Sequence, residues 1–344
     1  MTSFSSARCW WFLLCVHLFL VGCGGDTSPP QKEVVVYCAL DREFAEPILK
    51  DWEKETGIQV RAVYDAESTK TVGLVNRILA EKSRPQCDLF WNNEVLHTLR
   101  LEREGLLAEY APQKAKEFPA EFQSPQHTWH GFAARARVLI INTKLLPDEA
   151  ARPKGMADLL KPKWKDKVAM AKPLFGTTAT HAACLFAAWG DEQAKEYFTA
   201  LKANARILSG NKQVALAVAG GELPIGLTDT DDALIELEKQ MPVAILYPDA
   251  EDMGTLFIPN TICLMKGSPH SAAAQRLADH LLQPQIEERL STGPSGQIPL
   301  HPRASASPRI KTPQQTKAMQ IDFSAAAAKW QKAAEFLTKE FASP

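Results

Sequence analysis

The stretch Ile225-Gly-Leu-Thr-Asp-Thr-Asp-Asp-Ala233 changes from apolar to acidic within a few residues. Its apolar part ends at Asp229, Asp231 and Asp232, and a helix-like segment follows over residues 233–240. A strand that ends in Thr and Asp and leads into a helix is typical of ligand loops at the carboxyl edge of an α/β sheet. A helix cap needs only one such side chain, whereas five consecutive ones carry oxygen here. We predict that this acidic loop faces a ligand; a capped helix with a solvated turn is the alternative.

Three strand–loop–helix units stand at the start of the globular sequence. Runs of β-forming residues occupy 33–38, 58–63 and 87–91, and a polar loop and an amphipathic helix pattern follow each of them. Repeated units of this kind predict a parallel sheet with helices on its faces. The polar loops then lie at the carboxyl ends of the strands and supply candidate ligand-binding side chains.

A second set of such units follows a long strand pattern at residues 129–142. Arg135 and Arg137 lie two apart in it and so share one face. Its length predicts a strand that passes between two lobes. After the next strand, Gly176-Thr-Thr178 begins a helix and offers free N–H groups to an anion, with ordinary capping as the alternative. Residues 254–265 again have a strand pattern, in which Pro259 predicts an edge strand or a bend.

The first residues predict export. Arg8 precedes an apolar run over residues 9–21, which is too short to cross a membrane and has the proportions of a signal peptide. The run closes with Leu20-Val-Gly-Cys23, which looks like a bacterial lipobox with Cys23 as the lipidated residue. Residues 24–32 are rich in Gly, Ser and Pro and suit a flexible tether. A plain signal peptide with an incidental cysteine is the alternative.

Composition narrows the class of protein. The chain has 344 residues, 45% hydrophobic and 23% charged, as expected for a globular protein with two lobes. The net charge of −1 shows no excess of basic residues of the kind that binds nucleic acids. Cys38, Cys87, Cys184 and Cys263 are widely spaced without a C-x-x-C pattern, so we predict buried free thiols and no zinc site.

No motif of a known enzyme class stands out. The sequence has no G-x-S-x-G, P-loop, H-E-x-x-H or dinucleotide-binding glycine pattern. We therefore expect a protein that is not an enzyme and has no resident cofactor. A secreted hydrolase that uses Asp229 and Asp231 as paired carboxylates is the alternative from another class.

Short segments along the chain resemble a known family. They include residues 34–37, 52–58, 88–91, 129–143, 158–165 and 211–222, together with Leu300. In this order they are similar to the family-1 solute-binding proteins of ABC importers, most closely the ferric-ion-binding group, over about residues 33–303. The resemblance implies a two-lobed α/β periplasmic-binding-protein fold (type II-like), each lobe a mainly parallel sheet flanked by helices, with hinge strands between. The implied division is a signal peptide (1–22), a tether (23–32), lobe 1 (33–134 with 246–305) and lobe 2 (135–245 with 306–344).

The resemblance also implies where a ligand binds. Iron-binding members carry two adjacent tyrosines where this chain has Thr230 and Asp231, so the tyrosine pair is absent here. The family's histidine falls at about Asp41, its glutamate at about Asn93, and its anion-binding helix start at Gly176–Thr178. Metal ligands are expected at Asp41, Asn93 and Asp231. The full set of expected ligand-binding residues is Tyr37, Asp41, Ser68, Thr69, Lys70, Asn92, Asn93, Glu94, Arg135, Gly176, Thr177, Thr178, Thr228, Asp229, Thr230, Asp231 and Asp232.

The expected function is capture of a small solute between the lobes by hinge closure. The first choice is ferric iron, or another metal, bound with a synergistic anion as the transported ligand. Oxygen ligands suit a hard metal, while Lys70, Arg135 and Arg137 favour an anion, so an organic cation such as a polyamine, a thiamine-like solute and a phosphorylated solute stay open. The expected partner is an ABC permease in the inner membrane. We expect a monomer in the periplasm or another extracytoplasmic space, anchored to the cell membrane through lipid on Cys23.

Overall fold

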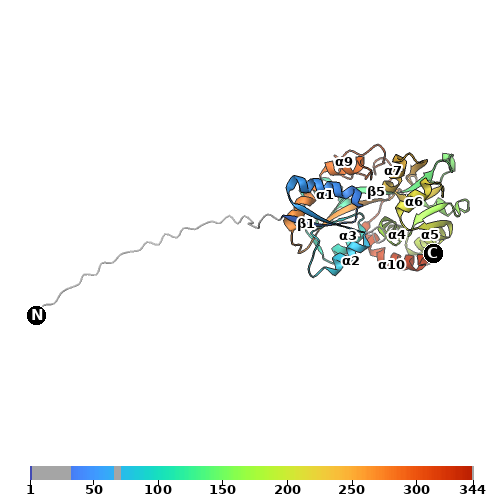
Figure 1. Cartoon of the computed structure of the whole chain (residues 1–344). Coiled ribbons are helices and arrows are strands. Elements are labelled where there is room, and N and C mark those ends of the chain that lie inside the picture. The colour runs from blue at the N-terminus through green and yellow to red at the C-terminus, as the bar shows by residue number, and fades with distance from the viewer. Residues whose placement is uncertain (2–31, 66–70, 343–344) are drawn as a thin grey trace. The chain divides into compact units, whose positions relative to one another are not determined.

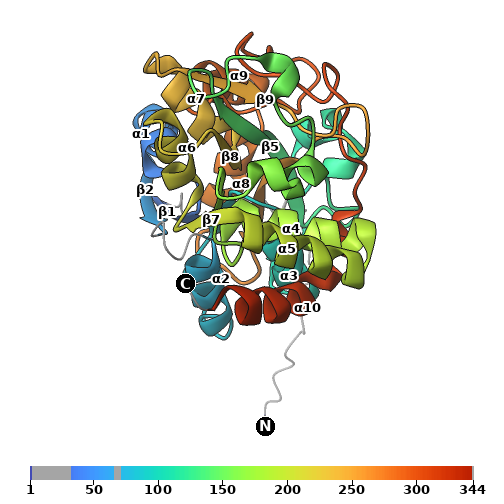
Figure 2. The ribbon, with the colours of Figure 1, turned by 90° about the vertical axis from the view of Figure 1, so that its right-hand side faces the viewer.

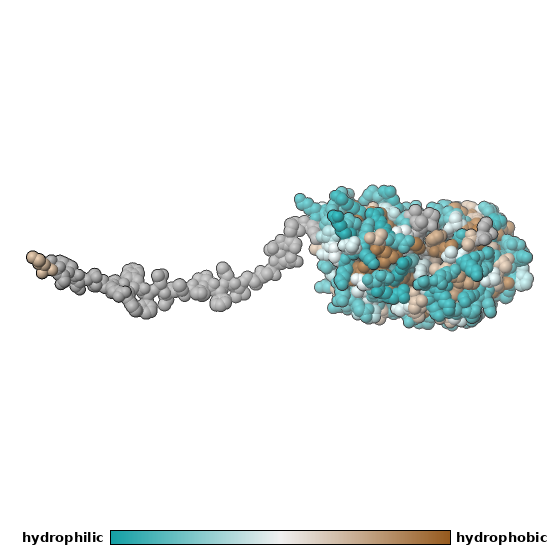
Figure 3. All heavy atoms as spheres, turned by 90° about the horizontal axis from the view of Figure 1, so that it is seen from below, coloured by the Kyte–Doolittle hydropathy of each residue, from teal (hydrophilic) through white to brown (hydrophobic). Residues whose placement is uncertain are grey.

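The computed structural model describes Met1 and residues 32–65 and 71–342. The expected lipidation site Cys23 and the expected ligand residues Ser68, Thr69 and Lys70 lie outside the described residues. Within the described residues, no helix has both the length and the apolarity needed to cross a membrane. Hydrophilic residues cover most of the face that Figure 3 shows of the folded unit.

One sheet organises residues 31–344. Its strands run in the order β2-β1-β3-β10-β5-β8-β6-β7, with β4 paired to β10 and β9 paired to β5. The strands are β1 (Glu33–Cys38), β2 (Gln59–Tyr64), β3 (Leu89–Asn92), β4 (Leu107–Ala108), β5 (Trp129–Asn142), β6 (Val168–Ala171), β7 (Ala205–Leu208), β8 (Ile225–Asp229), β9 (Val243–Leu246) and β10 (Phe257–Met265). This mixed α/β architecture confirms the predicted fold class.

Parallel pairing holds each outer part of the sheet together. β1 pairs in parallel with β2 and β3, and β6 pairs in parallel with β7 and β8. Between these sets, β5 and β10 run antiparallel to their neighbours. The first part of β5 pairs with β10 and its last part with β8 and β9, so this strand joins the two sets as its length predicted.

Helices cover both faces of the sheet. One apolar core packs under α1 (Arg42–Thr56), α6 (Asn211–Ala219), α7 (Thr230–Glu238), α8 (Ser271–Leu281) and α9 (Pro284–Thr292). A second core packs under α2 (Val72–Ala80), α3 (Leu96–Arg103), α4 (Gly176–Trp189), α5 (Asp191–Asn204) and α10 (Phe323–Phe341). Figures 1 and 2 show these layers, with α1, α7 and α9 toward the top and α2 and α10 toward the bottom. Val138 and Ile140 of β5 enter the first core, and Leu139 and Ile141 the second, as expected for a strand buried on both sides.

Short 3₁₀ segments fill several connections. They are η2 (Gln113–Glu117), η3 (Ala120–Phe122), η4 (Glu149–Ala151), η5 (Met156–Leu160) and η6 (Pro162–Trp164). The four cysteines at 38, 87, 184 and 263 are buried, and within the described part of the chain none of them forms a disulfide.

The structure decides one open prediction about the strands and adds one strand that was not predicted. β10 pairs with strands on both sides, so Pro259 does not place it at an edge. The alternative, a bend, is confirmed by a register shift between Ile258 and Asn260. The short strand β7 was not predicted, because its four residues contain Arg206 and are only partly buried.

Gly226 in β8 shows how closely helix α6 packs on the sheet. A Cβ atom added there would lie 2.5 Å from Cγ1 of Val214 and 2.9 Å from Cγ2 of Val218, both on α6. We expect Gly226→Ala to lower the free energy of unfolding by about 1–3 kcal/mol, because overpacking forces the helix away from the strand. Urea denaturation would measure the loss. If the clash is the cause, the further substitution Val214→Ala should cost less in Gly226→Ala than in the wild type; strictly additive losses would contradict it.

Candidate solute-binding pocket

A polar pocket opens where five parallel strands end. Its lining residues follow β1, β3, β6 and β7 or stand at the end of β8, the carboxyl edge where α/β sheets bind ligands. It therefore draws on both sets of parallel strands. The lining residues are Asp41, Asn93, Arg135, Ala171, Lys172, Phe175, Gly176, Thr177, Thr178, Ser209, Gly210, Asn211, Asp229, Asp231 and Asp232.

Two long helices point their N-termini into this pocket. Helix α4 begins at Gly176 after the N-cap residue Phe175, and α6 begins at Asn211 after Gly210. Neither N-cap side chain accepts a hydrogen bond from its helix. Among the described residues, no acceptor is present for the N–H groups of residues 176–178 or 211–213. Helix starts with unpaired N–H groups carry partial positive charge and bind anions.

A buried network fixes these two helix starts to each other. Asp229 accepts hydrogen bonds from Arg137 Nη1 (2.6 Å), from Asn211 Nδ2 (3.0 Å) and from the Thr177 hydroxyl. Asn211 Oδ1 accepts in turn from the Thr178 hydroxyl at 3.0 Å. The hydroxyls of Thr177 and Thr178 are therefore used inside the protein. The backbone N–H groups, rather than these hydroxyls, are what the helix starts offer to a ligand.

Arg135 lies among the carboxylates of the same pocket. Its Nε is 3.2 Å from Asp231 Oδ2, and its Nη1 donates to the backbone oxygen of Asn93 at 2.8 Å. Burial alone would lower the pKa of Arg135, but Asp231, Asp229, Asp41 and Asp232 together raise it above its ordinary value. The guanidinium thus stays charged at any pH at which the protein is folded.

The carboxylates of Asp229, Asp231 and Asp232 form a compact cluster. One oxygen from each lies within 4.8 Å of the others. Oxygen ligands at such spacing suit a hard cation. Asp41 adds a fourth carboxylate to the pocket, and Arg135, Lys172 and the helix starts supply positive charge, so the walls carry both signs.

Nine of the seventeen expected ligand-binding residues line this pocket. They are Asp41, Asn93, Arg135, Gly176, Thr177, Thr178, Asp229, Asp231 and Asp232. The three expected metal ligands are among them. The structure therefore brings together expected residues from five separate segments of the chain.

Four other expected residues lie beneath the pocket and have structural partners. Glu94 is fully buried and accepts from the N–H groups of Leu96 and His97, so it caps α3. Asn92 donates to Glu94 and to Thr98. The Thr228 hydroxyl donates to the backbone oxygen of Asn211 in α6. The Thr230 hydroxyl accepts from the backbone N–H of Ala136 in β5. Polar side chains that follow a strand can point back into the protein, which the sequence pattern alone does not reveal.

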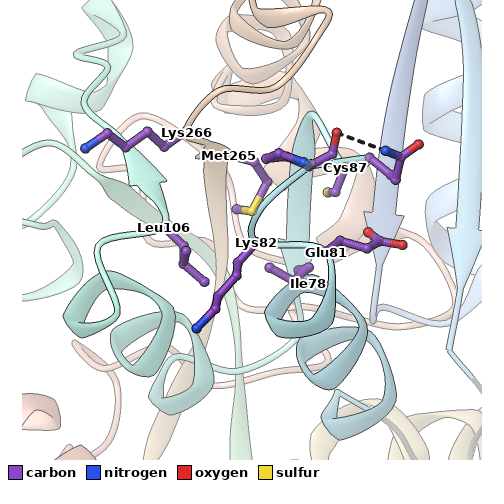
Figure 4. Close-up of a pocket in the computed structure, with 9 residues that line it drawn as sticks. Ile78, Glu81, Lys82, Cys87, Leu106, Met265 and Lys266 are labelled. Atoms are coloured by element: carbon purple, nitrogen blue, oxygen red, sulfur yellow. Dashed lines mark hydrogen bonds between the residues drawn. The ribbon is translucent and has the colours of Figure 1, made fainter.

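Tyr37 lies on another side of the molecule. Its ring is buried, its hydroxyl donates to both carboxylate oxygens of Glu81 (2.9 and 3.1 Å), and burial raises its pKa far above the ordinary value. Glu81 belongs to a different pocket, shown in Figure 4 between Ile78, Lys82, Leu106 and Met265. Among the described residues, none of the expected ligand residues lines that pocket, and no carboxylate cluster or helix start lies in it. We therefore assign solute binding to the polar pocket.

Four lining residues were not predicted as ligand residues although the sequence contained a signal. Ser209, Gly210 and Asn211 join β7 to α6, and β7 was not predicted as a strand. Gly210-Asn211 before an apolar helical stretch is a helix-start pattern that points to this turn. Lys172 follows β6 directly and could have been found by its position at a strand end.

A fold of this kind with a polar pocket at the carboxyl edge defines a ligand-binding protein of the periplasmic type. The sequence matches the family described as "Bacterial extracellular solute-binding protein" over residues 87–326. The chain belongs to this family. Its members bind a small ligand and work with an ABC permease, and the family and fold are those of proteins that are not enzymes.

Individual relatives carry different ligands in their names. The Fe(3+)-binding periplasmic protein of Serratia marcescens is 22% identical over 330 residues, 95% of each chain. A candidate 2-aminoethylphosphonate-binding periplasmic protein of Salmonella typhimurium is 28% identical over 246 residues, 69% of this chain and 68% of the relative. The crystal structure of iron-bound HitA from Pseudomonas aeruginosa superposes with a TM-score of 0.81 at 24% identity and covers 89% of this chain and 99% of HitA. At that identity the last comparison shows the fold alone.

Proposed function

We propose that this chain is the extracytoplasmic solute-binding component of an ABC importer, anchored to the membrane by lipid on Cys23. The family and the pocket at the edge of the sheet support the role. The lipobox-like sequence Leu20-Val-Gly-Cys23 supports the anchor. Lobe 1 comprises residues 33–134 with 246–305, and lobe 2 residues 135–245 with 306–344. The lobes close on the solute by bending at the strands that join them, and the closed form is presented to the permease.

The solute carries a phosphate-like or phosphonate-like anionic group, which binds at the paired starts of α4 and α6. The observation that carries this proposal is the pair of uncapped helix N-termini that face one pocket. Several convergent N–H groups recognise a tetrahedral oxyanion well, and Lys172 adds a full positive charge. The phosphonate named for the Salmonella relative belongs to this chemical class.

The remainder of the solute is positively charged. Beyond the helix starts, the pocket presents Asp41 and Asp232, whose carboxylates favour an ammonium group on the same molecule. A small zwitterion with an amine at one end and an oxyanion at the other matches both walls. Its overall neutrality also fits a pocket in which four carboxylates face two basic side chains and two helix starts.

Ferric iron with a synergistic anion is the second candidate. The cluster of Asp229, Asp231 and Asp232 within 4.8 Å favours it, and so do the names of the iron-binding relatives. It ranks second because arginines already pair with Asp229 and Asp231. All five tyrosines lie in the described part of the chain and none of them lines the pocket, so phenolate ligands of the ferric-binding group are missing.

A negative charge placed at the start of α6 tests the anion site. Ser209 is exposed and lines the pocket, so Ser209→Asp changes the charge without disturbing a core. We expect it to weaken binding of 2-aminoethylphosphonate and inorganic phosphate by about tenfold or more, because the new carboxylate occupies the helix start and repels the oxyanion. Isothermal titration calorimetry of the mature chain would measure both affinities.

The matched control places the same charge farther along the same helix. Leu216 is an exposed residue of α6 outside the pocket, and Leu216→Glu should leave both affinities within about twofold. Equal losses in the two variants would show a general charge effect. If the wild type binds neither probe but binds Fe³⁺ with carbonate, the anion proposal fails and the iron candidate replaces it.

A further inference from the structure

Arg135 is the cationic centre of the carboxylate cluster. The Arg135 side chain is only 3% exposed, yet it lines the pocket and lies within the field of four aspartates. It is held from two sides, by Asp231 after β8 and by the backbone of Asn93 after β3. A second guanidinium, Arg137, holds Asp229 from behind the pocket wall.

We propose that Arg135 is the specificity-determining residue of the site, a built-in counter-cation that makes solute binding independent of metal. The inference rests on the proposed function, since it concerns the same pocket. In this arrangement the guanidinium neutralises the aspartates and helps to attract the oxyanion. A metal ion is thereby excluded from a cluster that would otherwise suit it.

The carboxylate oxygens of Asp229 and Asp231 already have partners within the protein, and these partners compete with a metal ion. Asp229 uses one oxygen for Arg137 and the other for Thr177 and Asn211. Asp231 places Oδ2 against Arg135, and its Oδ1 accepts from the N–H of Asp232. An ion bound by these oxygens would stand within a few ångströms of a buried guanidinium, and like charges repel strongly where solvent is excluded.

Removing the Arg135 guanidinium should reverse the preference of the pocket for an anion over a metal ion. In Arg135→Gln, Asp231 loses the buried guanidinium 3.2 Å from its Oδ2, and the oxygens of Asp231, Asp232 and Asp41 should hold a hard cation more tightly. The same change removes positive charge from the oxyanion's surroundings. One substitution is thus expected to weaken anion binding and to create metal binding.

The experiment titrates chelator-treated mature protein with inorganic phosphate, and separately with Ca²⁺ and with Fe³⁺ supplied as its nitrilotriacetate complex. The wild type should bind phosphate equally well with and without EDTA and show no saturable metal binding. Arg135→Gln should bind phosphate about tenfold more weakly and metal at least about tenfold more tightly than the wild type. The double variant Arg135→Gln/Asp231→Asn should lose the gained metal binding.

Two further variants separate this role from a general effect of charge or of folding. Lys172→Gln removes a positive charge from the pocket outside the aspartate cluster, so it should weaken phosphate binding without creating metal binding. If Arg135→Gln does not fold, as circular dichroism would show, Arg135→Lys keeps the charge and should still exclude metal. Metal binding by Arg135→Lys or by Lys172→Gln would overturn the proposal.

The outcomes distinguish this inference from the proposed function. If wild-type phosphate binding is abolished by EDTA and restored by Fe³⁺ or Ca²⁺, Arg135 does not replace a metal, while solute binding itself stands. If the wild type binds neither phosphate nor either metal, the anion-binding function fails and the inference fails with it. Unchanged metal affinity in a folded Arg135→Gln variant would contradict the inference alone.

Discussion

Replacing Arg137 by Met is expected to lower the free energy of unfolding by about 3–5 kcal/mol, because it leaves the Asp229 carboxylate buried without its countercharge. The Arg137 side chain is fully buried and that of Asp229 is 5% exposed, with 2.6 Å between Nη1 and Oδ1. Methionine fills most of the volume of the arginine stem, so the loss reports the charge rather than a cavity. Guanidinium chloride denaturation, with the slope checked for two-state behaviour, would measure it.

An exposed ion pair supplies the matched control. Arg61 and Glu33 are 2.8 Å apart, but 60% of the Arg61 side chain is exposed. Arg61→Met should cost less than about 1 kcal/mol, because water replaces the lost partner. The double variant Arg137→Met/Asp229→Asn should recover most of the loss. A cost below about 1 kcal/mol for Arg137→Met would mean that solvent reaches Asp229, and the description of this network would then be wrong.

The fold was predictable because local patterns and topology agree. Continuous apolar runs at β1, β3, β6 and β8 indicated strands buried on both faces, and the helices between them indicated parallel pairing. Gly57 follows the amphipathic pattern of α1, and it adopts the left-handed conformation in which glycine commonly ends a helix. The length of the β5 segment distinguished it from its neighbours and predicted its place between two sets of strands.

Features that depend on tertiary context were not predictable. Pro259 indicated an edge strand or a bend, but only the tertiary structure shows that β10 is paired on both sides and shifts its register there. β7 is a four-residue strand at one end of the sheet and carries too little apolar periodicity to detect.

The position of the pocket was predictable from the topology of the sheet rather than from single residues. The carboxyl ends of parallel strands converge, so loops distant in sequence could be assigned to one site, and Asp41, Asn93 and Asp231 indeed line it together. Sequence could not tell which side chain in each loop points outward. Asn93 lines the pocket whereas its neighbour Glu94 turns inward to cap α3, and both are equally plausible ligands as sequence.

Replacing Glu287 by Ala is expected to lower the free energy of unfolding by about 3–5 kcal/mol, since it leaves three buried backbone N–H groups without an acceptor. Glu287 of α9 accepts from Ala133 (2.5 Å), Leu300 (2.9 Å) and His301 (2.7 Å). Ala133 adopts φ of +44° in the middle of β5, opposite the register shift in β10. A non-glycine residue keeps such a conformation only when its surroundings hold it there, and Glu287 provides that restraint.

The pH dependence of the free energy of unfolding tests whether ionisation of the buried Glu287 carboxylate destabilises the folded protein. Burial raises the pKa of Glu287 above its ordinary value, although the N–H groups of Leu300, Ala133 and His301 oppose the shift. The folded state therefore binds the proton more tightly than the unfolded state. Stability from this group is fully present below the ordinary pKa of about 4 and is lost as pH rises through the raised folded value. Glu287→Gln, which keeps the shape without the charge, should abolish that slope.

The neighbouring Glu288 is a control: replacing it also removes a carboxylate, but one that is less buried. Glu288 is partly exposed and accepts one N–H, that of Ser305, so Glu288→Ala should cost less than about 1 kcal/mol. Urea denaturation from pH 4 to pH 7 would compare the wild type with all three variants. A loss in Glu287→Ala no larger than that in Glu288→Ala would mean that water satisfies the three N–H groups. Side-chain packing would then determine the irregular pairing of β5 and β10. The unusual backbone at Ala133 would have to be held by Asn260, whose amide donates to the carbonyl of Ala133.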